Sequence, residues 1–94
     1  MTVLVRLPQA LLPDAGGSAV LQVDLAADGT LADLLAAVGQ AHPALVRRIC
    51  DETGAVRRFV NVFVGDEECR RLQGLHTPVP DGTEVLVVGS VAGG

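Results

Sequence analysis

The stretch at positions 58–64 reads Arg58-Phe59-Val60-Asn61-Val62-Phe63-Val64. Valines alternate here with a second set that holds both phenylalanines and an asparagine, which is the period-two pattern of a β-strand with two different faces. Asn61 indicates which face is buried, because an amide in an aliphatic core would need hydrogen-bond partners. We therefore predict that the valines face the core and that Phe59 and Phe63 lie on an open face.

Further strands are predicted on both sides of this one. Residues 2–7 and 20–25 alternate in the same way, and the turn-forming residues 13–18 between them indicate a hairpin. After a turn at Gly65, residues 67–71 are predicted to form a short exposed strand. A last strand is expected at residues 84–89, after the turn Pro80-Asp81-Gly82.

One main helix is expected between the hairpin and the 58–64 strand. Its apolar residues recur at the i, i+3, i+4 and i+7 spacing of one helical face, at Leu31, Leu34, Leu35 and Val38. Thr30 is placed to cap its start with Asp33 as the capping-box partner, while Gly39 and His42-Pro43 are expected to stop it. A second, shorter helix is predicted at residues 44–49.

The composition limits the classes of function. A chain of 94 residues, 49% of them hydrophobic, suits one folded domain and excludes intrinsic disorder. The net charge of −4 argues against nucleic acid or an anionic membrane surface as a partner and favours a basic protein. No secretory signal or membrane-spanning run is present, so we expect a cytoplasmic protein, monomeric on its own.

Enzyme-like groupings of side chains are scarce. No metal site is expected, because the four candidate ligands show no ligand spacing: His42, Cys50, Cys69 and His76. Both cysteines are interpreted as small, semi-buried apolar residues. The acidic residues 66–68 are interpreted as a solvated turn, and the arginine pairs as solubilising, although such pairs can also grip a phosphate or an acidic partner: Arg47-Arg48, Arg57-Arg58 and Arg70-Arg71.

The chain ends in Ser90-Val91-Ala92-Gly93-Gly94, directly after the last predicted strand. Two glycines without a Cβ make the thinnest possible peptide, which can pass through a narrow channel and deliver its carboxylate to another protein's active site. The alternative is a frayed end without function. We predict a domain over residues 1–89 and a flexible tail over residues 90–94.

Two parts of the chain resemble the sulfur-carrier proteins of the ThiS/MoaD type. They are Asp81-Gly82-Thr83-Glu84-Val85 with the Val91-Ala92-Gly93-Gly94 end, and residues 59–64 with Asp66-Glu67. The resemblance implies an α+β, ubiquitin-like β-grasp fold, in which a mixed sheet of four to five strands packs on one main helix and a C-terminal tail projects. Within the family, residues 58–61, Gly74-Leu75 and the tail are most similar to carriers used for cysteine biosynthesis in actinobacteria.

The resemblance also implies a function. A ubiquitin-activating-like adenylyltransferase and sulfurtransferase would use ATP to adenylate the Gly94 carboxylate, and sulfide would then convert it to a thiocarboxylate. The carrier itself would bind no cofactor and catalyse nothing; a biosynthetic enzyme such as a cysteine or thiosugar synthase would accept the sulfur. Three alternatives remain open: a ubiquitin-like protein modifier, the small subunit of molybdopterin synthase, and a non-catalytic β-grasp interaction domain.

Two sets of residues are candidates for contact with partners. Val91, Ala92 and Gly93 would enter the partner enzymes with Gly94. On the sheet, strand alternation turns Leu86 and Val88 to the open face, where Phe59, Phe63 and Leu4 are also expected. Such an apolar cluster predicts a docking patch; the alternative is that a short second helix or a loop covers it.

Overall fold

The structure is a computed structural model that describes residues 1–89. Four strands are five residues long, and two α-helices stand between the second and third of them. In chain order the main elements are β1 (Thr2–Arg6), β2 (Val20–Asp24), α1 (Leu31–Ala41), α2 (Pro43–Ile49), β3 (Val60–Val64), β4 (Glu67–Glu68) and β5 (Val85–Gly89). Three short 3-10 helices complete the fold: η1 (Gln9–Ala15), η2 (Cys69–Arg71) and η3 (Gly74–His76).

The strands form one mixed sheet in the order β2-β1-β5-β3-β4. β1 and β2 are the predicted antiparallel hairpin. The last strand, β5, inserts between β1, to which it is parallel, and β3, to which it is antiparallel. The five strands and the main helix confirm the predicted β-grasp fold; the projecting tail of that prediction lies outside the described residues.

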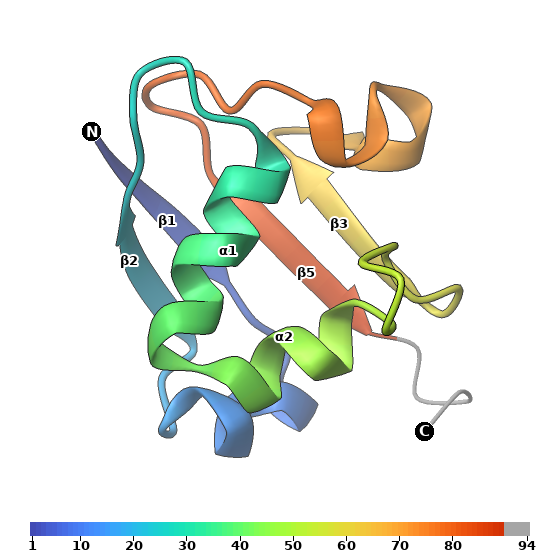
Figure 1. Cartoon of the computed structure of the whole chain (residues 1–94). Helices are drawn as coiled ribbons and strands as arrows, with labels where there is room; N and C mark the ends of the chain where they lie inside the picture. The colour runs from blue at the N-terminus through green and yellow to red at the C-terminus, as the bar shows by residue number, and fades with distance from the viewer. Residues whose placement is uncertain (90–94) are drawn as a thin grey trace.

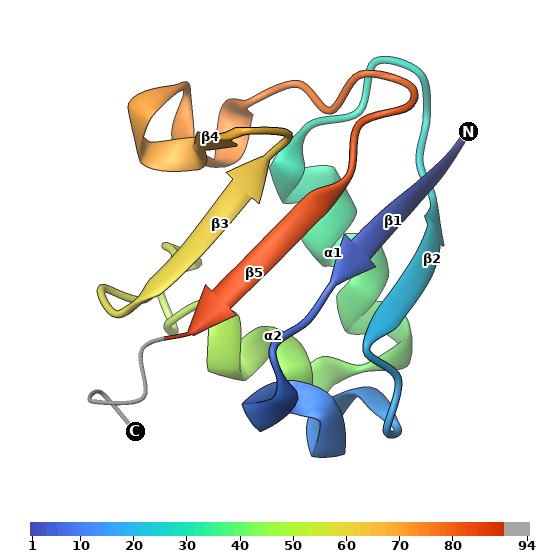
Figure 2. The same ribbon diagram turned by 180° about the vertical axis from the view of Figure 1, so that it is seen from behind.

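Both α-helices cover the same face of the sheet (Figure 1). The core between the layers is aliphatic, and Leu34, Leu45, Ile49 and Val62 are among its fully buried members. Seen from behind, β1, β5 and β3 stand in front of the helices, so the second face of the sheet is open (Figure 2). In residues 1–89 no helix has the length and apolarity needed to cross a membrane.

Helix α1 begins with the predicted capping box. The backbone N–H of Asp33 donates to the Thr30 hydroxyl at 3.3 Å, and the Thr30 N–H donates to the Asp33 carboxylate at 2.9 Å. The predicted apolar stripe faces the core. Gly39 was wrongly expected to help stop the helix: α1 continues to Ala41, because an interior glycine costs a helix only about 1 kcal/mol, and the end comes at His42-Pro43.

Two segments differ from the sequence prediction. The helix η1 takes up the first half of the turn expected at residues 13–18, and it buries Leu11 and Ala15 against the core. The strand expected at residues 67–71 is limited to β4, and the chain then turns into η2. The strand ends there because the side chain of Cys69 is drawn into the core, where it is 1% exposed.

Candidate functional site

Strand β5 has one buried and one open face. Val85 and Val87 are at most 1% exposed, whereas Leu86 and Val88 are 40% and 38% exposed. The difference follows from the alternation of side chains along a strand. Because α1 and α2 lie on the valine side, Leu86 and Val88 face away from the helices.

Strand β3 adds Phe63 to the same open face, and Phe59 lies in the turn just before the strand. The register places Phe63 opposite Leu86 and Asn61 opposite Val88. Phe63 is half-buried, and Phe59, just before the strand, is 48% exposed. The predicted inside and outside of this strand are confirmed.

We call this group the open-face patch; its members are Leu4, Phe59, Phe63, Leu86 and Val88. Leu4 is half-buried on β1, which adjoins β5 in the sheet. The alternative that the second helix covers the patch is wrong, because α2 buries Leu45 and Ile49 in the core on the other side of the sheet.

An ion pair lies beside the patch that the sequence analysis did not identify. Arg6 stands opposite Leu86 in the sheet, and its Nε donates to the Glu84 carboxylate. The hydrogen bond and the charge of Arg6 lower the pKa of Glu84. Residues 78 positions apart in the chain form this pair, so only the register of β1 against β5, which no local pattern shows, could have revealed it.

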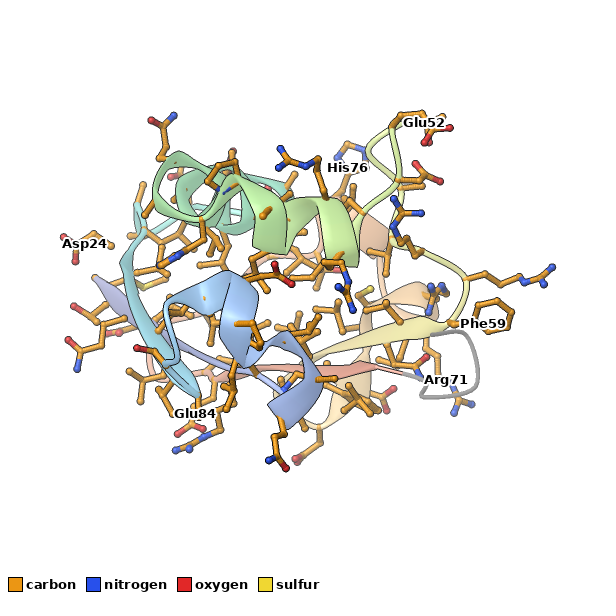
Figure 3. The ribbon with its side chains drawn as sticks, turned by 90° about the horizontal axis from the view of Figure 1, so that it is seen from below. Asp24, Glu52, Phe59, Arg71, His76 and Glu84 are labelled. Carbon is orange, nitrogen blue, oxygen red and sulfur yellow. The ribbon has the colours of Figure 1, made fainter. Side chains whose placement is uncertain are left out.

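The last described residue before the tail, Gly89, is paired with Val60 at the start of β3. Phe59 is therefore next in the chain to the partner of the last described residue, and the Arg58 guanidinium stacks over its ring at 4.7 Å. Viewed from the end of the molecule where β5 stops, Phe59 lies at one edge, while Glu84 lies toward the other (Figure 3). The predicted tail residues lie outside the described part: Val91, Ala92, Gly93 and Gly94.

A second feature that the sequence did not show is the set of contacts made by Arg70. One guanidinium nitrogen donates to the carbonyl of Arg57 at 2.7 Å and to that of Val56 at 3.4 Å. The other donates to the Asn61 side chain at 3.3 Å and lies 3.4 Å from the Glu68 carboxylate. Arg70 thus connects the segment before β3 to the edge of the sheet.

The remaining candidate residues do not form a reactive centre in the described part of the chain. Cys50 and Cys69 are both buried free thiols, more deeply than the semi-buried positions expected. Burial, together with a hydrogen bond to Glu68, raises the pKa of Cys69 to about 11. No cluster of three or more His, Cys, Asp or Glu side chains within residues 1–89 could hold a metal ion.

The geometry of the sheet can be compared with known proteins. The model of the ThiS family matches residues 14–94, which is most of the chain and includes its last residue. The chain belongs to the ThiS family. Its ThiS-family match therefore covers α1, the open-face patch apart from Leu4, and the diglycine end.

Similar proteins support the same assignment over the whole length. The sulfur carrier protein CysO of Mycobacterium tuberculosis is 35% identical over 97 aligned positions that cover 100% of both chains. A chain in the crystal structure of the Amycolatopsis orientalis BexX/CysO complex has a TM-score of 0.86 at 30% identity, covering 98% of this chain and 99% of that one. Haloferax volcanii SAMP1 has a TM-score of 0.82 at 30% identity, with 100% of both chains covered.

Proposed function

We propose that this ThiS-family protein is a sulfur carrier whose reactive group is the carboxylate of Gly94. The observation that carries the proposal is the family match through residue 94, together with end-to-end similarity to a protein named as a sulfur carrier. A carrier of this kind supplies a carboxylate and leaves the catalysis to its partners.

The proposed chemistry has two steps, both performed by a partner enzyme. The Gly94 carboxylate oxygen first attacks the α-phosphorus of ATP, and pyrophosphate leaves. A sulfide donor then attacks the carbonyl carbon of the acyl adenylate, the bond to AMP breaks, and a thiocarboxylate remains. Activation is needed because a carboxylate becomes a good electrophile only when its oxygen is part of a good leaving group.

Two kinds of partner follow from this chemistry. An activating enzyme binds ATP and adenylates the tail, so the carrier holds no cofactor of its own. A sulfur-accepting biosynthetic enzyme, for example a cysteine or thiosugar synthase, then takes up the thiocarboxylate. The crystallised complex of a similar CysO chain with BexX supports the idea that carriers of this fold bind a protein partner directly.

The open-face patch is proposed as the surface that docks on these enzymes. Its exposed members, Phe59, Leu86 and Val88, are 48%, 40% and 38% exposed, and they lie next to Gly89, where the sheet ends and the tail begins. A partner that takes Gly94 into its active site must also come close to this part of the domain. Burial of the patch would then hold the domain while Val91, Ala92 and Gly93 enter the partner.

A ubiquitin-like modifier is the second candidate, and the similarity to SAMP1 favours it as the alternative. The two functions use the same activated carboxylate and differ in what attacks it. Sulfide gives a thiocarboxylate, whereas a lysine amine of another protein gives an amide bond. The mass of the product distinguishes them.

The test uses the full chain, the activating enzyme, ATP and a sulfide source, followed by intact-mass measurement. Replacement of one oxygen by sulfur raises the mass by ~16 Da, because sulfide displaces AMP from the activated carboxylate. We expect this gain in the unaltered protein and none after deletion of Gly94. Gly93→Val should also prevent it, since a branched side chain cannot pass where only backbone fits.

Two results would contradict the proposal. Retention of the mass gain after deletion of Gly94 would place the sulfur elsewhere on the chain. An unaltered protein that forms only amide-linked products would assign it to the modifier class. Circular dichroism of each variant establishes that it is folded before its mass is interpreted.

A further inference from the structure

The arginines of this acidic protein are unevenly paired. Arg6, Arg48 and Arg70 each lie within 4.0 Å of a carboxylate. Within residues 1–89 the other four form no ion pair at that distance: Arg47, Arg57, Arg58 and Arg71. Arg57 and Arg58 are the two of these that come immediately before Phe59 in the chain. Arg58 stacks on the Phe59 ring, whereas the guanidinium of Arg57 is hydrogen-bonded to α2, on the helix-covered side of the sheet.

The position of these two arginines is fixed by contacts on both sides. The Nε of Arg57 donates to the carbonyl of Arg47, in the last turn of α2, at 2.9 Å. Arg58 stacks over Phe59, and Val60 pairs with Gly89. The charge of Arg58 therefore lies at Phe59 and that of Arg57 at the last turn of α2, on the segment that precedes the pairing of Val60 with Gly89.

The carboxylates near this segment are already engaged. One oxygen of Asp51 accepts hydrogen bonds from the hydroxyl and N–H of Thr53 and from the N–H of Ala55. Glu68 accepts from the Cys69 thiol and pairs with Arg70. Hydrogen bonds from Thr53 chiefly lower the pKa of Asp51, and the charge of Arg57 adds to this effect. Within residues 1–89, Arg58 is the one of the two whose side chain makes neither an ion pair nor a hydrogen bond, so its guanidinium is available to a carboxylate that a partner brings.

The geometry points to Arg57 and Arg58 as a cationic contact that recognises an acidic surface on the activating enzyme, at the rim of the channel that receives the tail. This inference rests on the proposed function and names the partner chemistry at its site. The net charge of −4 favours a basic partner for the molecule as a whole, but the charge beside the tail has the opposite sign. A partner that is basic over most of its surface, with carboxylates only at this rim, would complement both the net charge and these arginines.

A protein surface fits this contact better than a nucleic acid. Arg58 stacks on an aromatic member of an apolar patch, which is the arrangement of a charged rim around a hydrophobic interface core. Nucleic-acid binding needs a continuous basic surface that neutralises several phosphates, and the chain carries eleven acidic residues against seven arginines. Charged rims act chiefly on encounter and on specificity, so their contribution weakens with salt.

The test measures the KM of the carrier in the thiocarboxylation reaction at low and at high salt. For Arg57→Gln with Arg58→Gln we expect a KM about tenfold higher at low salt and an unchanged kcat, since lost binding that is equal in ground and transition states raises KM alone. At ~0.5 M NaCl the difference should shrink to less than about twofold, because salt screens exposed charges. Arg57→Lys with Arg58→Lys retains the charges and should behave nearly as the unaltered protein.

The matched control carries the same change of net charge at the other side of the molecule, in Ser18→Glu with Gln40→Glu. Both positions are exposed, and Ser18 precedes β2, at the opposite edge of the sheet from β3 and β4. The KM of this control variant should equal that of the unaltered protein. An equal rise in the control, or an unchanged KM in the folded glutamine pair, overturns the inference. The Arg58 side chain makes no hydrogen bond within residues 1–89, so Arg58→Gln alone serves if the pair fails to fold.

The two proposals fail in different ways. An unaltered protein that gains no sulfur contradicts the proposed function, and the inference falls with it. A protein that gains sulfur but tolerates the loss of both arginines contradicts the inference alone. The lysine pair adds a third distinction, because a KM that rises there too would assign the effect to guanidinium geometry and not to charge.

Discussion

The two thiols are the residues that might be expected to carry sulfur, and the structure makes both of them poor candidates. Cys50 is 7% exposed and Cys69 is 1% exposed. Burial and the hydrogen bond to Glu68 raise the pKa of Cys69 to about 11. At pH 8 roughly one such thiol in a thousand is therefore ionised, and only the thiolate is nucleophilic. Sulfur held on Gly94 needs neither of them.

Cys50→Ser combined with Cys69→Ser should therefore still gain ~16 Da in the thiocarboxylation assay, because the carboxylate is the electrophile. The double variant should be less stable by about 1–3 kcal/mol, since a buried hydroxyl without a partner is costly. Intact mass measures the first effect and chemical denaturation the second. A folded double variant that gains no mass would move the chemistry to a thiol.

Single residues also show the limit of what the sequence can predict. Asn61 was sufficient to assign the faces of β3, because the cost of burying an amide is a local property. The contacts of Arg70 were not predictable, since they join residues 9 to 14 positions apart through the particular path of the chain around β3. The pairing of Arg6 with Glu84 required the register of two strands from opposite ends of the chain.

Among the elements, the strands and α1 were predictable and the short 3-10 helices were not. The alternation of β1, β2, β3 and β5 and the helical spacing of apolar residues in α1 repeat along each element, so the pattern is strong. The helices η1 and η2 depend on a few side chains each, such as Leu11 and Cys69, that are drawn into the core by packing. A pattern of that length does not stand out from the loop that surrounds it.

The two faces of β5 lead to a prediction that separates docking from folding. Val88→Asp places a charge at a position 38% exposed on a central strand and should lower the stability by about 1 kcal/mol, because Asp is a poor strand former, while the protein stays folded. If the patch docks on the activating enzyme, the same change should weaken binding strongly, because a carboxylate in the apolar core of an interface loses its hydration. Isothermal titration of the folded variant against that enzyme measures the effect.

Val87→Asp is the matched control on the same strand. Val87 is 1% exposed, so an unpaired carboxylate there should cost about 3–5 kcal/mol and unfold much of the protein. Unchanged affinity of folded Val88→Asp would remove the patch from recognition and leave the tail alone to account for it. Unfolding of Val88→Asp would show that the open face is covered.

At the scale of the whole molecule, the order of the strands could not be obtained from local patterns. Nothing in the alternation of β5 indicates that it inserts between β1 and β3 or that it runs parallel to β1. The resemblance to the sulfur-carrier family predicted only a mixed β-grasp sheet of four to five strands, which the structure confirms; the strand order comes from the structure. The insertion has a functional consequence, because it brings the end of β5 beside Phe59 and the open-face patch.

The same topology indicates that residues 1–89 fold without the last residues of the tail. All the buried hydrophobic residues of the described part lie between Val3 and Val87, and every strand of its sheet ends by Gly89. A chain that stops at Val91 should therefore keep its free energy of unfolding to within about 0.5 kcal/mol and gain no sulfur.

Leu34→Ala, which empties a fully buried site in α1, should lower the free energy of unfolding by about 2–5 kcal/mol and still gain sulfur while folded. Chemical denaturation and intact mass, measured on both variants, test whether stability and sulfur acceptance are separable; a truncated chain that loses stability would show that the tail belongs to the folded unit.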